Sequence, residues 1–342
     1  MNYIAPWWLP SGNLQTIFPA LYSRRVFGPH PVYTRERWQA PDGDFVDVDW
    51  LIDPVHPEPV EGRARATSTG SARTDKPLLA LFHGLEGSSR SHYAEAFADF
   101  AYAHELAYAV PHFRGCSGEL NYAPRAYHSG DHEEIGWILQ QLRSCHVGPI
   151  AAVGVSLGGN ALLRWAAEQG NSAGCLVGAV AAVCSPIDLA AGGWAIGRGF
   201  NRLVYTTMFM RTMRPKALAK LDQHPGLFDR ARMLAARDLR DFDDLFTAPL
   251  HGFKDADDYY ARASAKPHLQ RIRIPTLVLN ARNDPFVPAW SLPSAQAAGA
   301  SVTLWQPAQG GHVGFPDGHL PGHVRRMPDQ VGAWLKRALG LR

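Results

Sequence analysis

The chain has 342 residues, of which 46% are hydrophobic and 19% charged, and its formal net charge is +3. Such a composition allows a sizeable globular core, and the small net charge gives no argument for nucleic-acid binding. Four cysteines without C-x-x-C spacing favour a reducing cytosol over a disulfide framework. No run of 18 apolar residues and no signal-peptide pattern is present, so we expect a cytoplasmic protein without a transmembrane segment.

Short apolar runs typical of strands alternate with helical patterns along most of the chain. The strand-like runs cover 45–51, 78–82, 107–112, 150–155, 176–183, 276–280 and 302–305. The first alternates polar and apolar residues, which predicts a half-exposed strand, whereas most of the others read as buried parallel strands. Helical patterns stand between them at 93–106, 133–142 and 160–169. The alternation predicts an α/β fold with a doubly wound, mostly parallel sheet covered by helices on both faces.

Two stretches do not fit this alternation. Residues 53–76 are rich in Pro, Gly, Ser and Thr and have no periodicity, which indicates an exposed loop without chemistry. The mostly helical chain between the strands at 176–183 and 276–280 is longer than one crossover requires. We therefore expect one domain over 1–342 with a helical cap, or lid, inserted at 187–250.

The predicted cap is basic. Six Lys or Arg residues and no acidic residue lie between Leu189 and Leu221, interleaved with aromatic residues and methionines. The cap could line an acyl-chain pocket and touch a membrane surface with its basic face. It could instead pack on the core and leave a solvated basic rim. We favour the pocket lining, and for the basic face we favour the solvated rim, so peripheral membrane contact stays an alternative.

The strongest motif is G-x-S-x-G around Ser156. A short apolar run ends at Gly154-Val-Ser-Leu-Gly158 and a helical pattern follows at once. In this strand–turn–helix context the motif is a nucleophile elbow, in which a strained turn lifts the serine hydroxyl out of the sheet edge. Glycines two residues before and after the serine give the turn the space it needs. Ser156 is therefore our candidate nucleophile.

Two residues further along the chain fit the partners of such a serine. Asp284 follows the apolar run at 276–280, and His312 follows the run at 302–305 within a Gly-Gly turn. The order serine, acid, histidine is the one this fold requires, with each residue placed just after a strand. Either residue alone could be an ordinary turn residue. Together they predict a triad in which Asp284 orients His312 and His312 takes the proton of Ser156.

The negative charge of an acyl-transfer intermediate needs two backbone amides. One should come from Leu157, at the start of the helix after Ser156. The other should come from Leu85, because the Gly-rich turn His83-Gly-Leu-Glu-Gly87 closes the strand at 78–82. We therefore expect an oxyanion hole of the Leu85 and Leu157 amides.

A second cluster, His128-Ser-Gly-Asp-His132, could be taken for a metal site. Two histidines four residues apart lack a convincing third ligand nearby, so we favour helix capping by Ser129 or Asp131. The Cys116 thiol has no base partner or helix start in the sequence and receives no catalytic role. We expect neither a metal nor a cofactor.

Long ordered motifs resemble the YheT-like α/β-hydrolases, family four of the AB hydrolase superfamily. They are PWWLPSGNLQTI from Pro6, HGLEGSSRSHYAEAFA from His83, FRGCSGELNYAPRAYHSGD from Phe113, GVSLGGNALLRW from Gly154, FDDLFTAPLHGFKDADDYY from Phe242, ARNDPFVP and GGHVGF. The resemblance implies an α/β-hydrolase fold, a Ser–Asp–His triad on Ser156, Asp284 and His312, and carboxylic-ester hydrolysis. The chain departs from the family at Asn13, where members usually carry His, and at Asn283, where they usually carry an acid. The role of Asn13 does not follow from the sequence.

These patterns predict a serine carboxylesterase acting on small-molecule esters with short- to medium-chain acyl groups. An alcohol acyltransferase, or a lipase or phospholipase, could use the same triad and acyl-enzyme. A catalytically silent binding module is a third class, but such proteins usually lose a triad residue. The sequence does not fix the oligomeric state.

Overall fold

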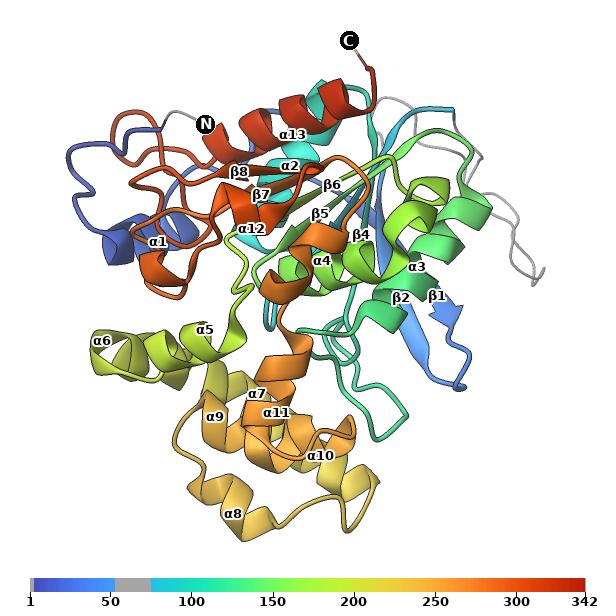
Figure 1. The fold of residues 1–342 in the computed structure, drawn as a ribbon, viewed down its shortest axis with the longest axis vertical. Helices are drawn as coiled ribbons and strands as arrows, with labels where there is room; N and C mark the ends of the chain where they lie inside the picture. The colour runs from blue at the N-terminus through green and yellow to red at the C-terminus, as the bar shows by residue number, and fades with distance from the viewer. Residues whose placement is uncertain (1–2, 53–74, 342) are drawn as a thin grey trace.

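The described part of the chain forms a single eight-stranded sheet. The computed structural model describes residues 3–52 and 75–341. Its strands are β1 (Tyr33–Gln39), β2 (Phe45–Leu51), β3 (Leu78–Phe82), β4 (Ala107–Pro111), β5 (Ile150–Val155), β6 (Ala179–Val183), β7 (Thr276–Leu279) and β8 (Val302–Trp305). They lie in the order β1-β2-β4-β3-β5-β6-β7-β8 (Figure 1). The β1–β2 and β2–β4 pairs are antiparallel and the other five are parallel, so the predicted mostly parallel α/β fold is confirmed.

Strand β3 shows why the parallel strands are apolar throughout. Leu78, Ala80 and Phe82 pack into the core on one face of the sheet, and Leu79 and Leu81 pack into the core on the other. Side chains alternate across a strand, so a strand covered on both faces needs apolar residues at every position.

Strand β2 differs from its prediction. Its alternating pattern predicts a half-exposed strand, but Asp47 and Asp49 are only 2% and 4% exposed. The cause is β1, which pairs Arg37 with Asp47 and Arg35 with Asp49 in register. In both pairs the Nε and Oδ1 atoms lie 2.7 Å apart, so these carboxylates are buried with a partner.

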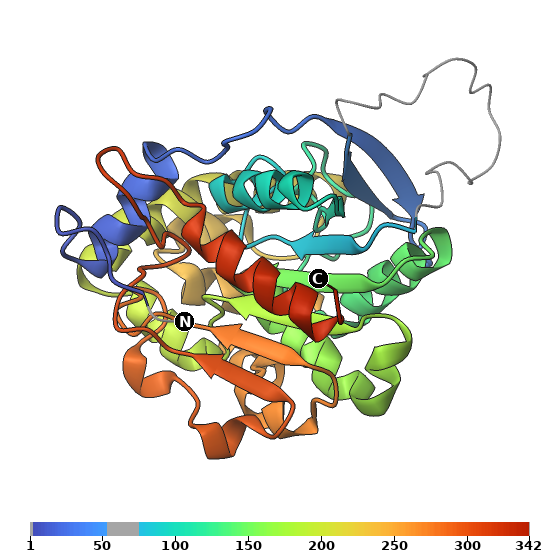
Figure 2. The ribbon, with the colours of Figure 1, turned by 90° about the horizontal axis from the view of Figure 1, so that it is seen from above.

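Four long helices cover the two faces of the sheet (Figure 2). Helices α2 (His92–Ala103) and α13 (Arg326–Ala338) lie together on one face. Helices α3 (His132–Cys145) and α4 (Leu157–Gln169) lie together on the other. The Asp131 side chain caps α3 by accepting from the amide of Glu134, so the predicted capping role falls to Asp131.

Between β6 and β7 the chain forms a layer of helices beyond the carboxyl ends of the parallel strands (Figure 1). Its elements are α5 (Leu189–Ile196), α6 (Gly199–Asn201), η2 (Arg202–Thr206), α7 (Thr207–Gln223), α8 (Arg230–Ala235), α9 (Leu239–Phe242), η3 (Asp243–Thr247), α10 (Ala248–Leu250) and α11 (Ala256–Ala263). The next element, η4 (Lys266–Arg271), packs against α4. Elements α6, η2 and α7 follow one another without a break, and we call them the 199–223 helix. The segment predicted as a cap, 187–250, contains α5 to α10; its action as a lid stays a prediction.

The remaining elements are α1 (Gly12–Leu21), η1 (Gly170–Cys175), η5 (Ala289–Ser291) and α12 (Ala295–Ala298). The strand expected at 176–183 begins only at Ala179, because η1 and a short turn occupy the residues before it. Of the loop predicted at 53–76, residues 53–74 lie outside the described residues. Within the described residues, no helix combines the length and apolar character that crossing a bilayer requires.

Candidate active site

Ser156 stands in the tight turn between β5 and α4. Its φ is 53°, in the left-handed region that a serine rarely adopts. The flanking glycines have no room for a side chain, since a Cβ on Gly154 would lie 2.5 Å from the carbonyl oxygen of Gly158. A Cβ on Gly158 would lie 2.5 Å from the carbonyl oxygen of His83. The close contacts between β5, α4 and the end of β3 therefore require the glycines of the motif.

The structure brings Ser156, His312 and Asp284 together. The distance from Ser156 Oγ to His312 Nε2 is 3.1 Å, and that from His312 Nδ1 to Asp284 Oδ2 is 2.9 Å. The other oxygen of Asp284 accepts from the backbone amides of Phe286 and Val287 at 2.7 and 3.3 Å. An ionised carboxylate can only accept a hydrogen bond. His312 Nδ1 is therefore protonated and donates this bond to Asp284. His312 Nε2 is then free to accept the hydroxyl proton of Ser156.

Helix α1 holds the loop that carries His312. The amide of His312 donates to Thr16 Oγ1 at 2.8 Å, and the amide of Gly310 donates to Gln15 Oε1 at 2.8 Å. Gln15 Oε1 also accepts from Asn283 Nδ2 at 2.9 Å, beside Asp284. Gln15 is fully buried, so its side chain fixes the acid loop and the base loop at once.

Sequence reasoning did not find this role of α1. The signal was present, because Gln15 and Thr16 lie within one of the motifs that carry the family resemblance. The two family departures also have partners in the structure. Asn283 lies between Gln15 and Gly311, whose amide donates to Asn283 Oδ1 at 3.0 Å. Asn13 Oδ1 accepts from the hydroxyl of Tyr205 at 2.9 Å, which joins α1 to the 199–223 helix.

A buried thiol adjoins the triad. Cys184 Sγ accepts from the amide of Val313 at 3.2 Å. Burial, with the nearby Asp284 carboxylate, raises the pKa of this thiol well above its usual range.

Within the described residues, Cys184, Asp284 and His312 form the one group of three potential metal ligands, with their ligand atoms within 4.8 Å of one another. His128 and His132 gain no third ligand there. Two of the three are already hydrogen-bonded to each other, so the absence of a metal stays our prediction.

The loop at the end of β3, which carries Leu85, lies beside the nucleophile turn, since a Cβ on Gly84 would lie 3.2 Å from Ser156 Cβ. The neighbouring amides are occupied, since Gly84 donates to the hydroxyl of Tyr93 at 2.9 Å and Glu86 donates to the hydroxyl of Tyr127 at 3.0 Å. Within the described residues, the amides of Leu85 and Leu157 donate to no other group. Both leucines line the pocket described below. An oxyanion hole requires two unoccupied backbone donors, so these two amides remain the predicted pair.

His83 ties this loop to the end of β4. Burial lowers the pKa of His83 to about 3, so its ring is neutral. Nε2 accepts from the amide of Phe113 at 3.0 Å, which leaves the proton on Nδ1 to donate to the Gly84 carbonyl at 2.8 Å. A neutral histidine therefore fixes the start of the Leu85 turn.

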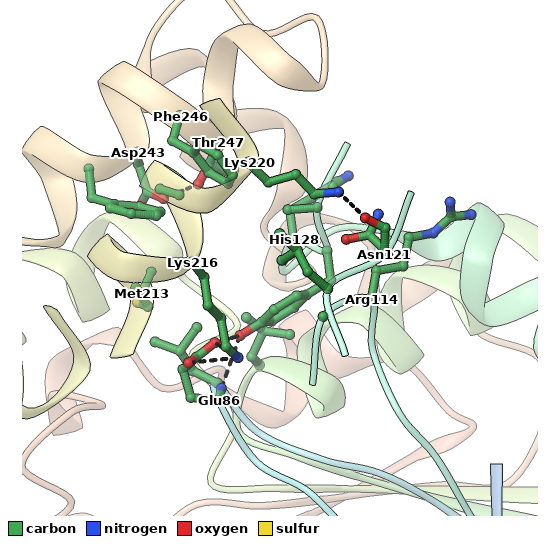
Figure 3. Close-up of a pocket in the computed structure, with 18 of the residues that line it drawn as sticks. Glu86, Arg114, Asn121, His128, Met213, Lys216, Lys220, Asp243, Phe246 and Thr247 are labelled. Carbon is green, nitrogen blue, oxygen red and sulfur yellow. Dashed lines mark hydrogen bonds and ion pairs between the residues drawn. The ribbon is translucent and has the colours of Figure 1, made fainter. Parts of the chain in front are cut away.

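Glu86 joins the same turn to the cap. Its φ is 56°, and its carboxylate lies 2.9 Å from Lys216 Nζ on α7. Glu86 Oε1 also accepts from the hydroxyl of Tyr127 at 3.0 Å (Figure 3). Lys216 from the cap and Tyr127 from the core thus hold Glu86 in a left-handed conformation, which is unusual for a residue other than glycine. Glu86 directly follows Leu85 in the chain.

A pocket opens between this loop and the cap (Figure 3). It contains about 580 Å³ of empty space, part of it open to solvent. Most of its walls are apolar side chains from both sides, which include Leu85, Leu120, Leu157, Met213, Phe242 and Phe246. Five charged residues also line it: Glu86, Arg114, Lys216, Lys220 and Asp243. Leu85 and Leu157, the two residues with free amides, are among its lining residues.

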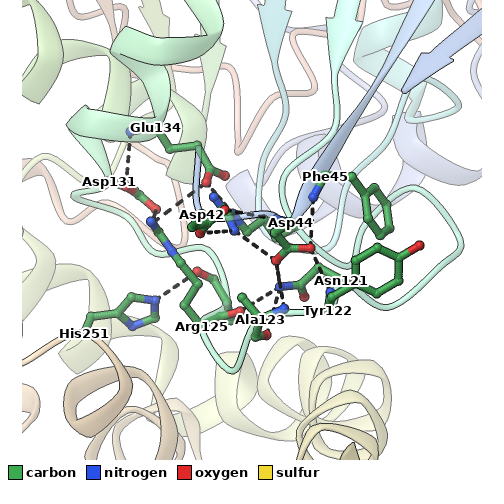
Figure 4. A network of polar contacts seen from close by, with 12 residues as sticks. Asp42, Asp44, Phe45, Asn121, Tyr122, Ala123, Arg125, Asp131, Glu134 and His251 are labelled. Carbon is green, nitrogen blue, oxygen red and sulfur yellow. Dashed lines mark hydrogen bonds and ion pairs between the residues drawn. The ribbon is translucent and has the colours of Figure 1, made fainter. Parts of the chain in front are cut away.

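A buried ionic network supports the wall of this pocket (Figure 4). Arg114 lies 2.9 Å from an oxygen of Asp44 and 2.5 Å from one of Glu134. Asp44 also accepts from Asn121 Nδ2 at 2.7 Å, and the ammonium of Lys220, which is 1% exposed, donates to the Asn121 carbonyl. Burial raises the pKa of Glu134 to about 7. The network fastens α7 of the cap to the loop after β4.

Comparison with known proteins gives matches over most of the chain. The sequence profile of the alpha/beta hydrolase fold matches residues 77–319. A protein of Escherichia coli (strain K12) named "Putative esterase YheT" is 38% identical over 327 residues, which cover 94% of this chain and 89% of that protein. Human phospholipase ABHD3 is 27% identical over 94% of this chain and 75% of its own length. The solved esterase Pf2001 of Pyrococcus furiosus has a TM-score of 0.52 at 15% identity, covering 93% of this chain and 99% of that one, which shows the fold alone.

Proposed function

The chain belongs to the α/β-hydrolase fold family, and on that premise we propose that it is a serine carboxylesterase for short- to medium-chain acyl esters. In this proposal Ser156 is the nucleophile, His312 is the general base and acid, and Asp284 orients His312. The observation that carries it is the unbroken line of hydrogen bonds, 3.1 Å from Ser156 to His312 and 2.9 Å from His312 to Asp284. The likeness to a protein named an esterase over 94% of the chain supports an ester substrate.

The reaction proceeds in two halves. Ser156 Oγ attacks the ester carbonyl carbon while His312 Nε2 takes the hydroxyl proton, and the carbonyl oxygen becomes an oxyanion. When the intermediate collapses, the alcohol leaves with the proton from His312 and the acyl group stays on Ser156. Water then attacks the acyl group, giving one proton to His312. The second collapse frees the carboxylic acid and returns that proton to Ser156.

The amides of Leu85 and Leu157 hold the oxyanion in both halves. The two amides are free of other acceptors in the described part of the chain, and their leucines line one pocket. One such donor typically contributes about 3 kcal/mol of transition-state stabilisation. The Asp284 carboxylate stabilises the imidazolium that forms on His312 in each half.

A lipase or phospholipase reaction on the same triad is the second candidate. It is favoured by the likeness to a protein named a phospholipase and by the apolar walls of the pocket. A p-nitrophenyl ester series from acetate to palmitate separates the two. An esterase is fastest on the short and medium chains, whereas a lipase keeps or gains rate on the long ones.

The first experiment is Ser156→Ala, with Ser144→Ala on the exposed end of α3 as the matched control. We expect hydrolysis of p-nitrophenyl butyrate to fall on the order of 10⁴-fold or more, since the nucleophile is lost. Labelling by a fluorophosphonate probe should be lost with it, while the control and the thermal unfolding curve stay unchanged. Substantial hydrolysis by a folded Ser156→Ala protein would contradict the proposal.

A second experiment adds ethanol to the parent enzyme with p-nitrophenyl butyrate. The products should contain less ethyl ester than free acid; the reverse would indicate acyl transfer.

A further inference from the structure

The 199–223 helix turns apolar side chains toward solvent. Phe200, Leu203 and Met208 are 51%, 75% and 51% exposed, whereas Tyr205 and Met210 on the other side are 3% and 5% exposed. Because η2 is a π turn, the step of five positions from Leu203 to Met208 spans about one turn and keeps these side chains on one side. A surface helix normally shows polar residues there.

Neighbouring elements extend this apolar surface. Trp194 on α5 and Trp290 on η5 are 53% and 68% exposed, and their ring centroids lie 6.2 Å apart. Helix α1 contacts the buried side of the 199–223 helix through the Asn13–Tyr205 hydrogen bond, and its Leu14 is 44% exposed. Figure 1 shows α1, α5 and α6 together at one side of the molecule. We call Trp194, Phe200, Leu203, Met208 and Trp290 the apolar face.

Arginines without acidic partners surround the apolar face. Arg198, Arg202 and Arg211 are exposed, and within the described residues no carboxylate forms an ion pair with any of them. The guanidinium of Arg198 lies over the ring of Trp194, 4.4 Å from its centroid. Their charge is therefore available to a negative partner. An apolar surface with indole rings and unpaired cations has the chemistry that anionic lipid headgroups and the acyl chains beneath them complement.

We propose that the apolar face docks the protein on the surface of an anionic phospholipid bilayer. The side chains of Phe200, Leu203 and Met208 enter the acyl boundary. The two tryptophans lie at headgroup depth, where an indole ring meets both apolar and polar surroundings. Arg198, Arg202 and Arg211 contact lipid phosphates. This docking does not require the proposed ester hydrolysis.

A line of aromatic rings leads from the apolar face to the triad. The ring of Phe200 lies 6.2 Å from that of Tyr205, which lies 4.5 Å from that of Phe286. Phe286 in turn lies 4.2 Å from the imidazole of His312. The docked surface is therefore three ring contacts from the base of the proposed triad. A bilayer would lie on the His312 side of the site.

The test uses the full chain with Ser156→Ala, so that no lipid is hydrolysed. It is mixed with vesicles of phosphatidylcholine alone or of phosphatidylcholine and phosphatidylglycerol, and the bound fraction is measured by co-sedimentation. We expect binding to the anionic vesicles, weakened by salt, with a blue shift of tryptophan fluorescence. Arg202→Glu with Arg211→Glu should lower the partition coefficient by about fivefold or more for each arginine. Leu203→Asp should lower it further, because a charge then faces the acyl boundary.

The matched control is Arg232→Glu with Leu234→Asp on α8, where Leu234 is 54% exposed and away from the apolar face. The control should bind as the parent does. The proposal would be overturned if the parent does not bind anionic vesicles. It would also be overturned if the control binds no better than the Arg202, Arg211 and Leu203 variants. A change from dimer to monomer in Leu203→Asp would overturn it too, since a second copy would then cover the face. With Ser156 intact, the same variants should keep their rate on p-nitrophenyl butyrate, so failed docking leaves the esterase proposal standing.

Discussion

The loop that carries His312 and the loop that carries Leu85 meet at one site but are held in different ways. The His312 loop is fixed by neutral groups of α1, and the Gln15 amide that holds it is completely buried. The Leu85 loop is fixed in part by the charged Glu86–Lys216 pair, and the Lys216 side chain is 38% exposed. Neutral buried contacts are indifferent to salt, whereas partly exposed ion pairs are screened. The His312 loop should therefore be less sensitive to salt than the Leu85 loop, which shares an ion pair with the cap.

The largest expected effect comes from the base side. Asp284→Asn keeps the size of the side chain but can leave His312 in the wrong tautomer, so kcat on p-nitrophenyl butyrate should fall by about 10⁴-fold. Steady-state kinetics measures the loss, and KM should change little. A variant that stays within tenfold of the parent rate would remove Asp284 from the triad.

Gln15→Ala tests how firmly α1 holds the base. The change leaves the buried Gly310 amide and Asn283 amide group without their shared acceptor, which should cost about 1–3 kcal/mol of unfolding free energy. Chemical denaturation measures the stability, and kcat should fall because His312 moves more freely. The control Gln296→Ala removes an exposed glutamine side chain and should stay within about 0.5 kcal/mol. Equal stability of the two variants would show that α1 does not fix the base loop.

Lys216→Met should have the smallest effect and separates the two loops. The ion pair with Glu86 is partly exposed, so its loss should cost no more than about 1 kcal/mol. We expect kcat to fall less than about fivefold, and added salt to lower the parent rate toward that of the variant. The variant itself should respond little to salt. The control is Arg211→Met, which removes an exposed unpaired cation from the same helix. If both variants respond to salt identically, the Glu86–Lys216 pair does not couple the cap to the Leu85 loop.

The fold and the central geometry followed from the sequence because they depend on local pattern and strand order. Ser156, Asp284 and His312 each come soon after a parallel strand, and the carboxyl ends of parallel strands meet at one sheet edge. The hydrogen bonds between α1 and the His312 loop could not be predicted from local pattern, since Gln15 and Gly310 are 295 residues apart. The left-handed conformation of Glu86 also has no local signal, because it depends on contacts from Tyr127 and Lys216.

The apolar face shows a second limit. Apolar residues at helical spacing in 199–223 predict a buried side, and one is present at Tyr205 and Met210. The helix carries more apolar residues than that side can take, and sequence periodicity does not tell which of them the core accepts. Leu203 and Met208 therefore became recognisable as surface residues only once the packing of α5 and α9 was known.

The contact between α1 and the His312 loop also sets an order of events during synthesis. Gln15 and Thr16 leave the ribosome early, and their partners at Gly310 and His312 leave it late. A nascent chain can form β5 and the Ser156 turn long before the histidine exists, so the serine stays inert during most of translation. We expect reactivity to arise only when the C-terminal strands close on the helix that was made first, which spares the unfinished enzyme from acylation.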